Sequence, residues 1–244
     1  MSMRYKGGVL SATAPVTSSS SAKGVWTMRQ QLQAIGGTGW PPAPPVFPNV
    51  GAPYGGGYIG GKISVLGIQY YLIVAPKASG ENSSRTWGTY GVTTGITSVI
   101  NGPTNSASLA ALGAAYQAAT FCEGLTIGGY SDWYLPAKNE LEVLYYFLKP
   151  TTEVNNTGFG SNANAVSPEP ISTDYTSGSP AQTSAGSGFR DGETNAFASE
   201  YYWSSTEVNA NWAWYQIFTD GRQASVNAYK DNITYVRAVR RVPV

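Results

Sequence analysis

The sequence predicts an α+β fold, in which helices pack on antiparallel strands and long irregular loops join these elements. Three observations support this prediction. β-rich runs occur near both ends of residues 56–244, two segments between them carry apolar residues at helical spacing, and stretches of Asn, Ser, Gly and Thr separate the elements. Apolar residues make up 42% of the 244 residues, which is enough to build a core.

The first expected element is a β-hairpin. Residues 58–65 and 68–75 are two β-rich runs, and the Leu66-Gly67 pair between them is a short turn. An amphipathic helix is expected next, over residues 108–123, with Gly124 as its stop. Its apolar positions are Leu109, Leu112, Ala115, Tyr116, Ala119 and Cys122. We expect Cys122 to be a small buried hydrophobic residue.

A second helix is expected over residues 136–148, because proline is favoured in the first turn and Lys149-Pro150 ends the pattern. Its apolar face comprises Leu141, Leu144, Tyr145 and Leu148. Residues 151–199 show little periodicity, and so long a loop inside a domain is usually functional. Four strands should then close the domain as an antiparallel meander, over residues 201–205, 213–219, 222–229 and 233–240.

Composition narrows the classes of partner. Charged residues make up only 12% of the chain and the net charge is +1, so a basic surface for nucleic acid is not expected. Abundant Tyr, Trp, Asn, Ser and Gly are typical of surfaces that bind through aromatic rings and adaptable hydrogen bonds, although they equally suit any extracellular β-rich protein. One cysteine excludes an intramolecular disulfide, and no window is long and apolar enough for membrane insertion.

Catalysis is not expected, because the chain contains no histidine. Ser-His-Asp, Cys-His and His-zinc chemistries are thereby excluded, and we predict no catalytic residues, no metal and no cofactor. Paired carboxylates could still serve a glycosidase. The available pairs, Asp191 with Glu193 and Glu200 with Glu207, lie in or beside a solvated loop, which disfavours that reading.

The N-terminal region differs in composition from the rest. We divide the chain into an extended attachment strap, residues 1–50, and a folded domain, residues 51–244. The strap is rich in Ser, Thr, Gly and Pro and cannot bury enough apolar surface to fold alone. Its aromatic residues, Trp26, Trp40 and Phe47, are candidate anchors that insert into a partner, or incidental residues of a disordered linker. Residues 1–10 lack the apolar core of a signal peptide, so we expect delivery by another route, such as a virus particle released by lysis.

Several motifs together resemble a known family. Residues 128–136 read GGYSDWYLP, residues 202–207 read YWSSTE and residues 235–240 read YVRAVR. With Glu140-Leu141, Ala213-Trp214 and the opening hairpin, they resemble the C-type-lectin-like domain at the C-terminus of the Legionella collagen-like adhesin, over about residues 56–244.

This resemblance implies a C-type-lectin-like fold, with two helices on a twisted antiparallel sheet and the chain ends joined by the first and last strands. It implies an adhesin or ligand binder rather than an enzyme. Calcium-dependent sugar binding does not carry over, because Ile171 follows Pro168-Glu169-Pro170. A single cysteine also does not satisfy the paired-cysteine chemistry of the related formylglycine-generating enzymes. The motif residues Trp133, Leu135, Glu140, Trp203 and Arg237 are interpreted as framework.

The strap carries a second resemblance. Residues 6–15 read KGGVLSATAP, residues 24–27 read GVWT and Trp40-Pro41 follows. This stretch is similar to the N-termini of tail-fibre and other virion structural proteins of marine bacteriophages. The similarity implies a segment that docks the protein onto other virion proteins.

Recognition is expected on the C-terminal strands and turns, where flat aromatic rings lie beside amide and guanidinium donors. The candidate ligand-binding residues are Asn209, Asn211, Trp212, Trp214, Gln216, Arg222, Gln223, Asn227, Tyr229 and Lys230. Alternatively, half of these residues simply coat a β-meander.

Three hypotheses for function follow. The first is a bacteriophage virion surface protein, a tail-fibre or tail-tip component that attaches to a host surface glycan or protein. The second is a structural decoration or adaptor protein of the capsid or tail, which contacts neighbouring virion subunits. The third is a bacterial adhesin. In the virion we expect a homo-oligomer, a trimer if the protein forms a fibre, because multivalency strengthens a strap with isolated anchors.

Overall fold

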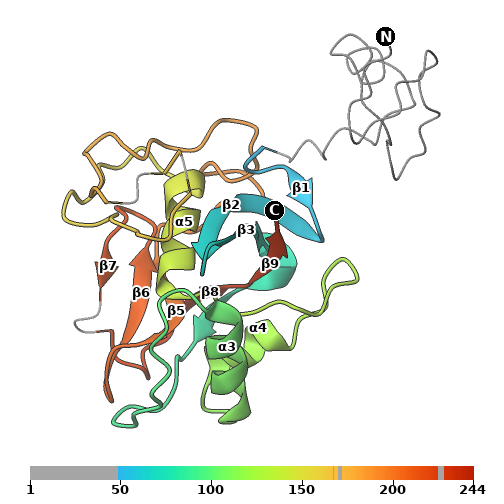
Figure 1. Cartoon of the computed structure of the whole chain (residues 1–244), viewed down its shortest axis with the longest axis vertical. Helices are drawn as coiled ribbons and strands as arrows, with labels where there is room; N and C mark the ends of the chain where they lie inside the picture. Colours follow the sequence, from blue (N-terminus) through green and yellow to red (C-terminus); the bar gives the residue numbers. More distant parts are fainter. Residues whose placement is uncertain (1–48, 167, 170–171, 225–227) are drawn as a thin grey trace, which may run out of the picture. The chain divides into compact units, whose positions relative to one another are not determined.

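The computed structural model describes residues 49–166, 168–169, 172–224 and 228–244. The strap up to Pro48, with Trp26, Trp40 and Phe47, and the candidate ligand residue Asn227 lie outside the described residues. The α+β class is confirmed. Within the described residues, antiparallel strands dominate two sheets, and the helices lie in the middle of the chain (Figure 1).

The first sheet joins the two ends of the domain. Its strands lie in the order β1 (Pro53–Tyr54), β2 (Gly57–Val65), β3 (Ile68–Val74) and β9 (Val239–Pro243), and every neighbouring pair is antiparallel. Figure 1 shows the C-terminal strand β9 beside the N-terminal hairpin.

The second sheet carries most of the C-terminal strands. Its order is β4 (Glu81–Arg85), β8 (Thr234–Arg237), β5 (Tyr201–Glu207), β6 (Ala213–Ile217) and β7 (Gln223–Ala224). The helices are α2 (Lys77–Gly80), α3 (Gly102–Ala111), α4 (Gln117–Glu123) and α5 (Lys138–Leu148).

The predicted hairpin is confirmed. Strands β2 and β3 pair from Tyr58 with Val74 to Val65 with Ile68, so that Leu66-Gly67 forms the turn. Leu66 has φ of 51° and Gly67 has φ of 83°, the positive values that a type I′ turn requires at both central residues. Leu66 is 93% exposed, so its side chain gains nothing from burial in return for this conformation.

The helix predicted over residues 108–123 is wrong as one element, because α3 ends at Ala111 and α4 begins at Gln117. Gly113 has φ of 107°, which a continuous helix cannot contain. Leu112 is consequently 53% exposed, whereas Leu109, Tyr116, Ala119 and Cys122 are buried as expected.

The helix predicted over residues 136–148 is confirmed as α5, two residues shorter at its start. Its predicted apolar face, Leu141, Leu144, Tyr145 and Leu148, is fully buried.

The predicted C-terminal meander is only partly correct. Strand β8 runs parallel to β5, where Tyr202 pairs with Tyr235, and antiparallel to β4, which the sequence did not indicate. The chain then leaves this sheet at Ala238. The amide of Ala238 donates to the Gly80 carbonyl (2.9 Å) and its carbonyl accepts from the Ala75 amide (3.0 Å), after which β9 joins the first sheet. The predicted strand 233–240 is therefore two strands in two sheets.

Two apolar clusters occupy opposite faces of the second sheet. Trp203 on β5 belongs to one cluster, which also contains Cys122 and residues of α3 and α4. Its neighbour Tyr202 points the other way and packs with Leu144 and Phe218 in the second cluster, which contains the buried face of α5. Because neighbouring strand residues alternate between faces, β5 contributes to both clusters.

Replacing Leu66 by asparagine should stabilise the protein. Asparagine tolerates positive φ, and Asn-Gly is the preferred type I′ turn, so Leu66→Asn should raise the free energy of unfolding by about 1 kcal/mol in urea titration. The matched control is Leu112→Asn, at an exposed leucine with φ of −74°. Equal effects of the two substitutions would contradict this account of the turn.

Candidate functional site

A cleft with a volume of about 850 Å³ lies beside the short edge strand β7. Its walls are largely aromatic, with amide, hydroxyl and guanidinium groups among the rings. The lining residues are Phe159, Tyr201, Trp203, Trp214, Tyr215, Arg222, Gln223, Ala224, Asn232, Ile233 and Thr234. No carboxylate is among them. Cavities of this size and character commonly hold small polar ligands.

The rings of the cleft come from neighbouring strands. Tyr201 and Trp203 lie two residues apart on β5, and both approach Tyr215 on β6, with ring centroids 5.0 Å and 5.8 Å from that of Tyr215. The indole of Trp203 donates to the Arg85 carbonyl (3.1 Å), which fixes the ring at the floor of the cleft. Tyr201 is exposed at the mouth.

The polar groups of the cleft are held by the surrounding structure. The guanidinium of Arg222 pairs with Asp220 at 3.2 Å near the surface, and the Gln223 amide donates to the Lys138 carbonyl at the start of α5 (2.9 Å). The Thr234 hydroxyl donates to the Tyr201 carbonyl. The bonds of Gln223 and Thr234 join β7 to α5 and β8 to β5 at the cleft.

Trp214 connects the cleft to α5. The ammonium group of Lys138 lies over the Trp214 ring, 4.6 Å from its centroid. Burial lowers the pKa of Lys138, and the nearby Glu142 opposes that effect. One face of the indole is thus covered by a cation, and the ring is held in place by this contact.

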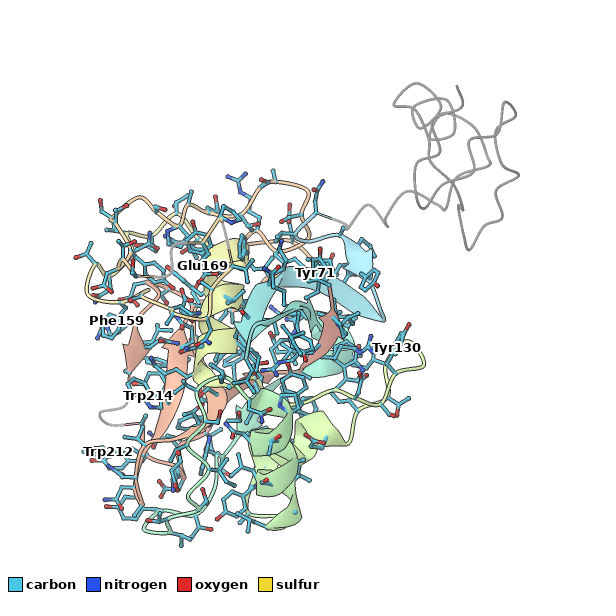
Figure 2. All side chains as sticks on the ribbon, in the orientation of Figure 1. Tyr71, Tyr130, Phe159, Glu169, Trp212 and Trp214 are labelled. Atoms are coloured by element: carbon cyan, nitrogen blue, oxygen red, sulfur yellow. The ribbon has the colours of Figure 1, made fainter. Side chains whose placement is uncertain are left out.

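A second aromatic group lies close to the cleft, and we call it the tyrosine platform: Tyr90, Trp212 and Tyr229. The Tyr229 centroid lies 5.8 Å from that of Tyr90 and 6.3 Å from that of Trp212. Tyr90 is 50% exposed and Tyr229 is 36% exposed. Figure 2 shows Phe159 and Trp214 of the cleft and Trp212 of the platform along the left side of the view.

A buried ion pair between Lys230 and Glu207 stabilises the platform. The Lys230 ammonium donates to Glu207 and to the Val92 carbonyl (2.6 Å), and Glu207 also accepts from the backbone amides of Thr94 and Gly95 (both 2.7 Å). Burial alone would raise the pKa of Glu207, but the bonds from Lys230 and the two amides outweigh it, so the pKa is lowered. The pair fastens the loop that carries Tyr90 onto β5.

The candidate recognition residues are divided between surface and interior. Asn209, Arg222 and Tyr229 are exposed, and Asn211, Trp212 and Trp214 are half-buried. Gln216 and Lys230 are fully buried and make internal bonds, so they do not lie on the open face that the sequence predicted for them. Gln223 is also buried, although it lines the cleft.

The five framework residues are all buried and bonded. Glu140 accepts from Tyr134 (2.6 Å), the Ala137 amide (2.7 Å) and Arg241 (2.5 Å). Arg237 donates to the Ala75 carbonyl (2.7 Å) and to Glu81 (2.8 Å). Trp133, Leu135 and Trp203 are at most 1% exposed.

One carboxylate of each pair that the sequence offered for acid chemistry is already bonded within the protein. Glu193 accepts from the backbone of Gly186 (2.6 Å) and Arg190 (3.0 Å), and Glu207 is in its ion pair. A second acidic pair was not expected from the sequence. Glu142 on α5 and Glu169 in the long loop are both buried, and Glu142 is bonded to Asn162 and Tyr175.

Among the described residues, no group of three or more acidic or cysteine side chains is placed to hold a metal ion. None of the helices in this part of the chain has the length and apolar character needed to cross a membrane.

Removing the buried cation should destabilise the protein strongly. Lys230→Met leaves Glu207 buried without its counter-charge and should lower the free energy of unfolding by about 3–5 kcal/mol. The matched control, Arg222→Met at the solvent-exposed pair with Asp220, should lower it by less than about 1 kcal/mol. Urea titration near neutral pH measures both, and equal losses would contradict the structural role of Lys230.

The pKa of Glu207 is lower in the folded protein than in the unfolded chain. The stability that this carboxylate contributes should therefore disappear as the pH falls below the pKa that Glu207 has in the unfolded chain.

Replacing Glu169 by an uncharged side chain should stabilise the protein. Burial, followed by the Glu142 carboxyl, raises the pKa of Glu169 to about 11, so the folded protein retains a proton that the unfolded chain releases. The free energy of unfolding therefore falls as the pH rises from the pKa of Glu169 in the unfolded chain towards its pKa in the folded protein. Glu169→Gln should raise the free energy of unfolding by about 1–3 kcal/mol near pH 8, with little gain near pH 4. The exposed Glu200, replaced by Gln, is the control, and a gain that does not depend on pH would refute this account.

The comparison with known families agrees with the motifs. Residues 81–240 match the model of the Lcl C-terminal domain family, a range that extends from β4 into β9 and includes the cleft and the platform. No curated protein matches the chain. The matched range covers more than half of the sequence and contains the framework residues and both aromatic groups, and on this evidence the chain belongs to the Lcl C-terminal domain family.

Proposed function

We propose that this protein attaches to surfaces by binding saccharide in the aromatic cleft beside β7. The observation that carries this proposal is the combination of Trp214, Tyr215 and Tyr201 with the donors Arg222 and Gln223 in one cavity of about 850 Å³. Aromatic faces pack on the apolar faces of sugar rings, while amide and guanidinium groups bond their hydroxyls. Membership of the Lcl C-terminal domain family supports an adhesin-like role.

We propose binding rather than catalysis. The whole chain lacks histidine, and the cleft lining contains no carboxylate that could act as an acid or base. The polar groups that are present can orient a ligand, but Arg222 and Gln223 are poor proton carriers at neutral pH.

The finer fold assignment is C-type-lectin-like. The pairing of β3 with β9 supports it, because the resemblance implies that the first and last strands bring the chain ends together. A fold of this kind leaves long loops free for recognition, and the described residues between α5 and β5 form such a loop.

We further propose that the protein works on a bacteriophage virion, as a tail-fibre or tail-tip component. The similarity of residues 6–15 and 24–27 to virion structural proteins supports this location. The strap would then bind other virion proteins, and the folded domain would face the host, in a homo-oligomer that multiplies weak contacts.

Trp214 should be required for binding. In the full-length protein, Trp214→Ala should weaken binding to immobilised polysaccharides (laminarin, dextran, xylan and alginate) and to host cells by about tenfold or more, because it removes one of the two indole rings that line the cleft. Tyr54→Ala is the matched control, since Tyr54 is 39% exposed and lies outside the cleft. Unchanged binding in the Trp214 variant would exclude the cleft as the site. No binding by the wild-type protein, with particle assembly lost in the variant, would instead favour the structural role.

A further inference from the structure

The tyrosine platform is continuous with the cleft along one strand. Trp214 lies on β6, and Trp212 precedes that strand, where it bridges to Tyr229. Residues two apart on an extended chain point to the same face, about 7 Å from each other. The rings of Trp212 and Trp214 therefore follow one another, and Tyr229 and Tyr90 extend the row beyond Trp212.

The platform also offers hydrogen-bond donors. The Asn209 side-chain oxygen accepts from the backbone amides of Asn211 (2.8 Å) and Trp212 (3.0 Å). Asn209 is exposed, so its amide group is accessible to a ligand. An aromatic row with an amide at its margin has the same chemistry as the cleft.

The backbone segments that carry the platform are joined by hydrogen bonds of Lys230. The carbonyl of Lys230 accepts from the amides of Trp87 (2.9 Å) and Gly88 (3.0 Å), while its ammonium bonds the Val92 carbonyl (2.6 Å). These bonds bracket Tyr90 in sequence, and Tyr229 directly precedes Lys230. One buried lysine thus ties together the backbone segments that carry both tyrosines, so that little backbone entropy is lost when a ligand covers them.

We propose that the tyrosine platform is a second saccharide subsite, and that the ligand is a saccharide chain long enough to run from the cleft across Trp212 to Tyr229 and Tyr90. This inference rests on the proposed function. A single sugar would occupy only part of the cleft and leave the platform bare. A chain would contact both, and its affinity would grow with length until the platform is covered.

The test is the dependence of affinity on chain length. The probes are oligosaccharide ladders, from disaccharide to octasaccharide, of each polysaccharide in the panel, and calorimetry on the full-length protein measures the affinity. Wild-type affinity should rise along the ladder of the polysaccharide that binds. The Tyr90→Ala/Tyr229→Ala double variant should bind the disaccharide like wild type but the octasaccharide about tenfold more weakly.

Retained disaccharide binding shows that the double variant is folded, and Tyr54→Ala should keep the full gain with length. The inference alone is overturned if wild type binds short and long chains equally, if the double variant keeps the gain, or if it loses affinity equally at every length. If wild type binds no member of any ladder, the proposed function fails, and the second subsite fails with it.

Discussion

The fold depends on the burial of one guanidinium group, that of Arg237. This side chain is fully buried at the end of β8, one residue before the chain leaves the second sheet. It bonds Glu81 on β4 (2.8 Å), the Ala75 carbonyl after β3 (2.7 Å) and the Asn195 carbonyl in the long loop (3.3 Å). If these segments moved away, the guanidinium would be buried and unpaired, which would destabilise the protein by several kcal/mol. The bonds of Arg237 therefore hold the segments in place. Both sheets and the loop region meet at this one residue.

Local patterns in the sequence were reliable where neighbouring residues determine the structure. The hairpin and α5 are formed by contacts that the apolar spacing encodes, and both were predicted. The break between α3 and α4 depends on the positive φ of Gly113, which a spacing count does not register. The passage of the chain from β8 to β9 depends on partners far away in sequence, Ala75 and Gly80, so the pattern of residues 233–240 alone could not reveal it.

The candidate site was also predicted only in part, because local sequence patterns do not reveal contacts between distant residues. Trp214 and Arg222 were expected at the surface and line the cleft, because aromatic and amide-rich turns are a compositional signal. Gln216 and Lys230 belong to the same kind of sequence, yet both are buried. Gln216 is buried because its strand is paired within the sheet, and Lys230 is buried because it pairs with Glu207, which is distant in sequence. Tyr90 was missed because its loop has no periodicity. Bonds from Lys230 and Glu207, both distant in sequence, hold that loop and bring Tyr90 beside Tyr229.

The pairing of β3 with β9 has a consequence for synthesis of the protein. The hairpin is made early, but the edge of β3 has no partner until Val239–Pro243 leaves the ribosome. During that interval, a row of backbone amides and carbonyls and the apolar residues beside it face solvent, which is the condition under which nascent chains pair with one another. The closing strand also adds long-range contacts, which slow folding. The arrival of Val239–Pro243 therefore decides whether a chain completes its own sheet or pairs with a neighbouring chain.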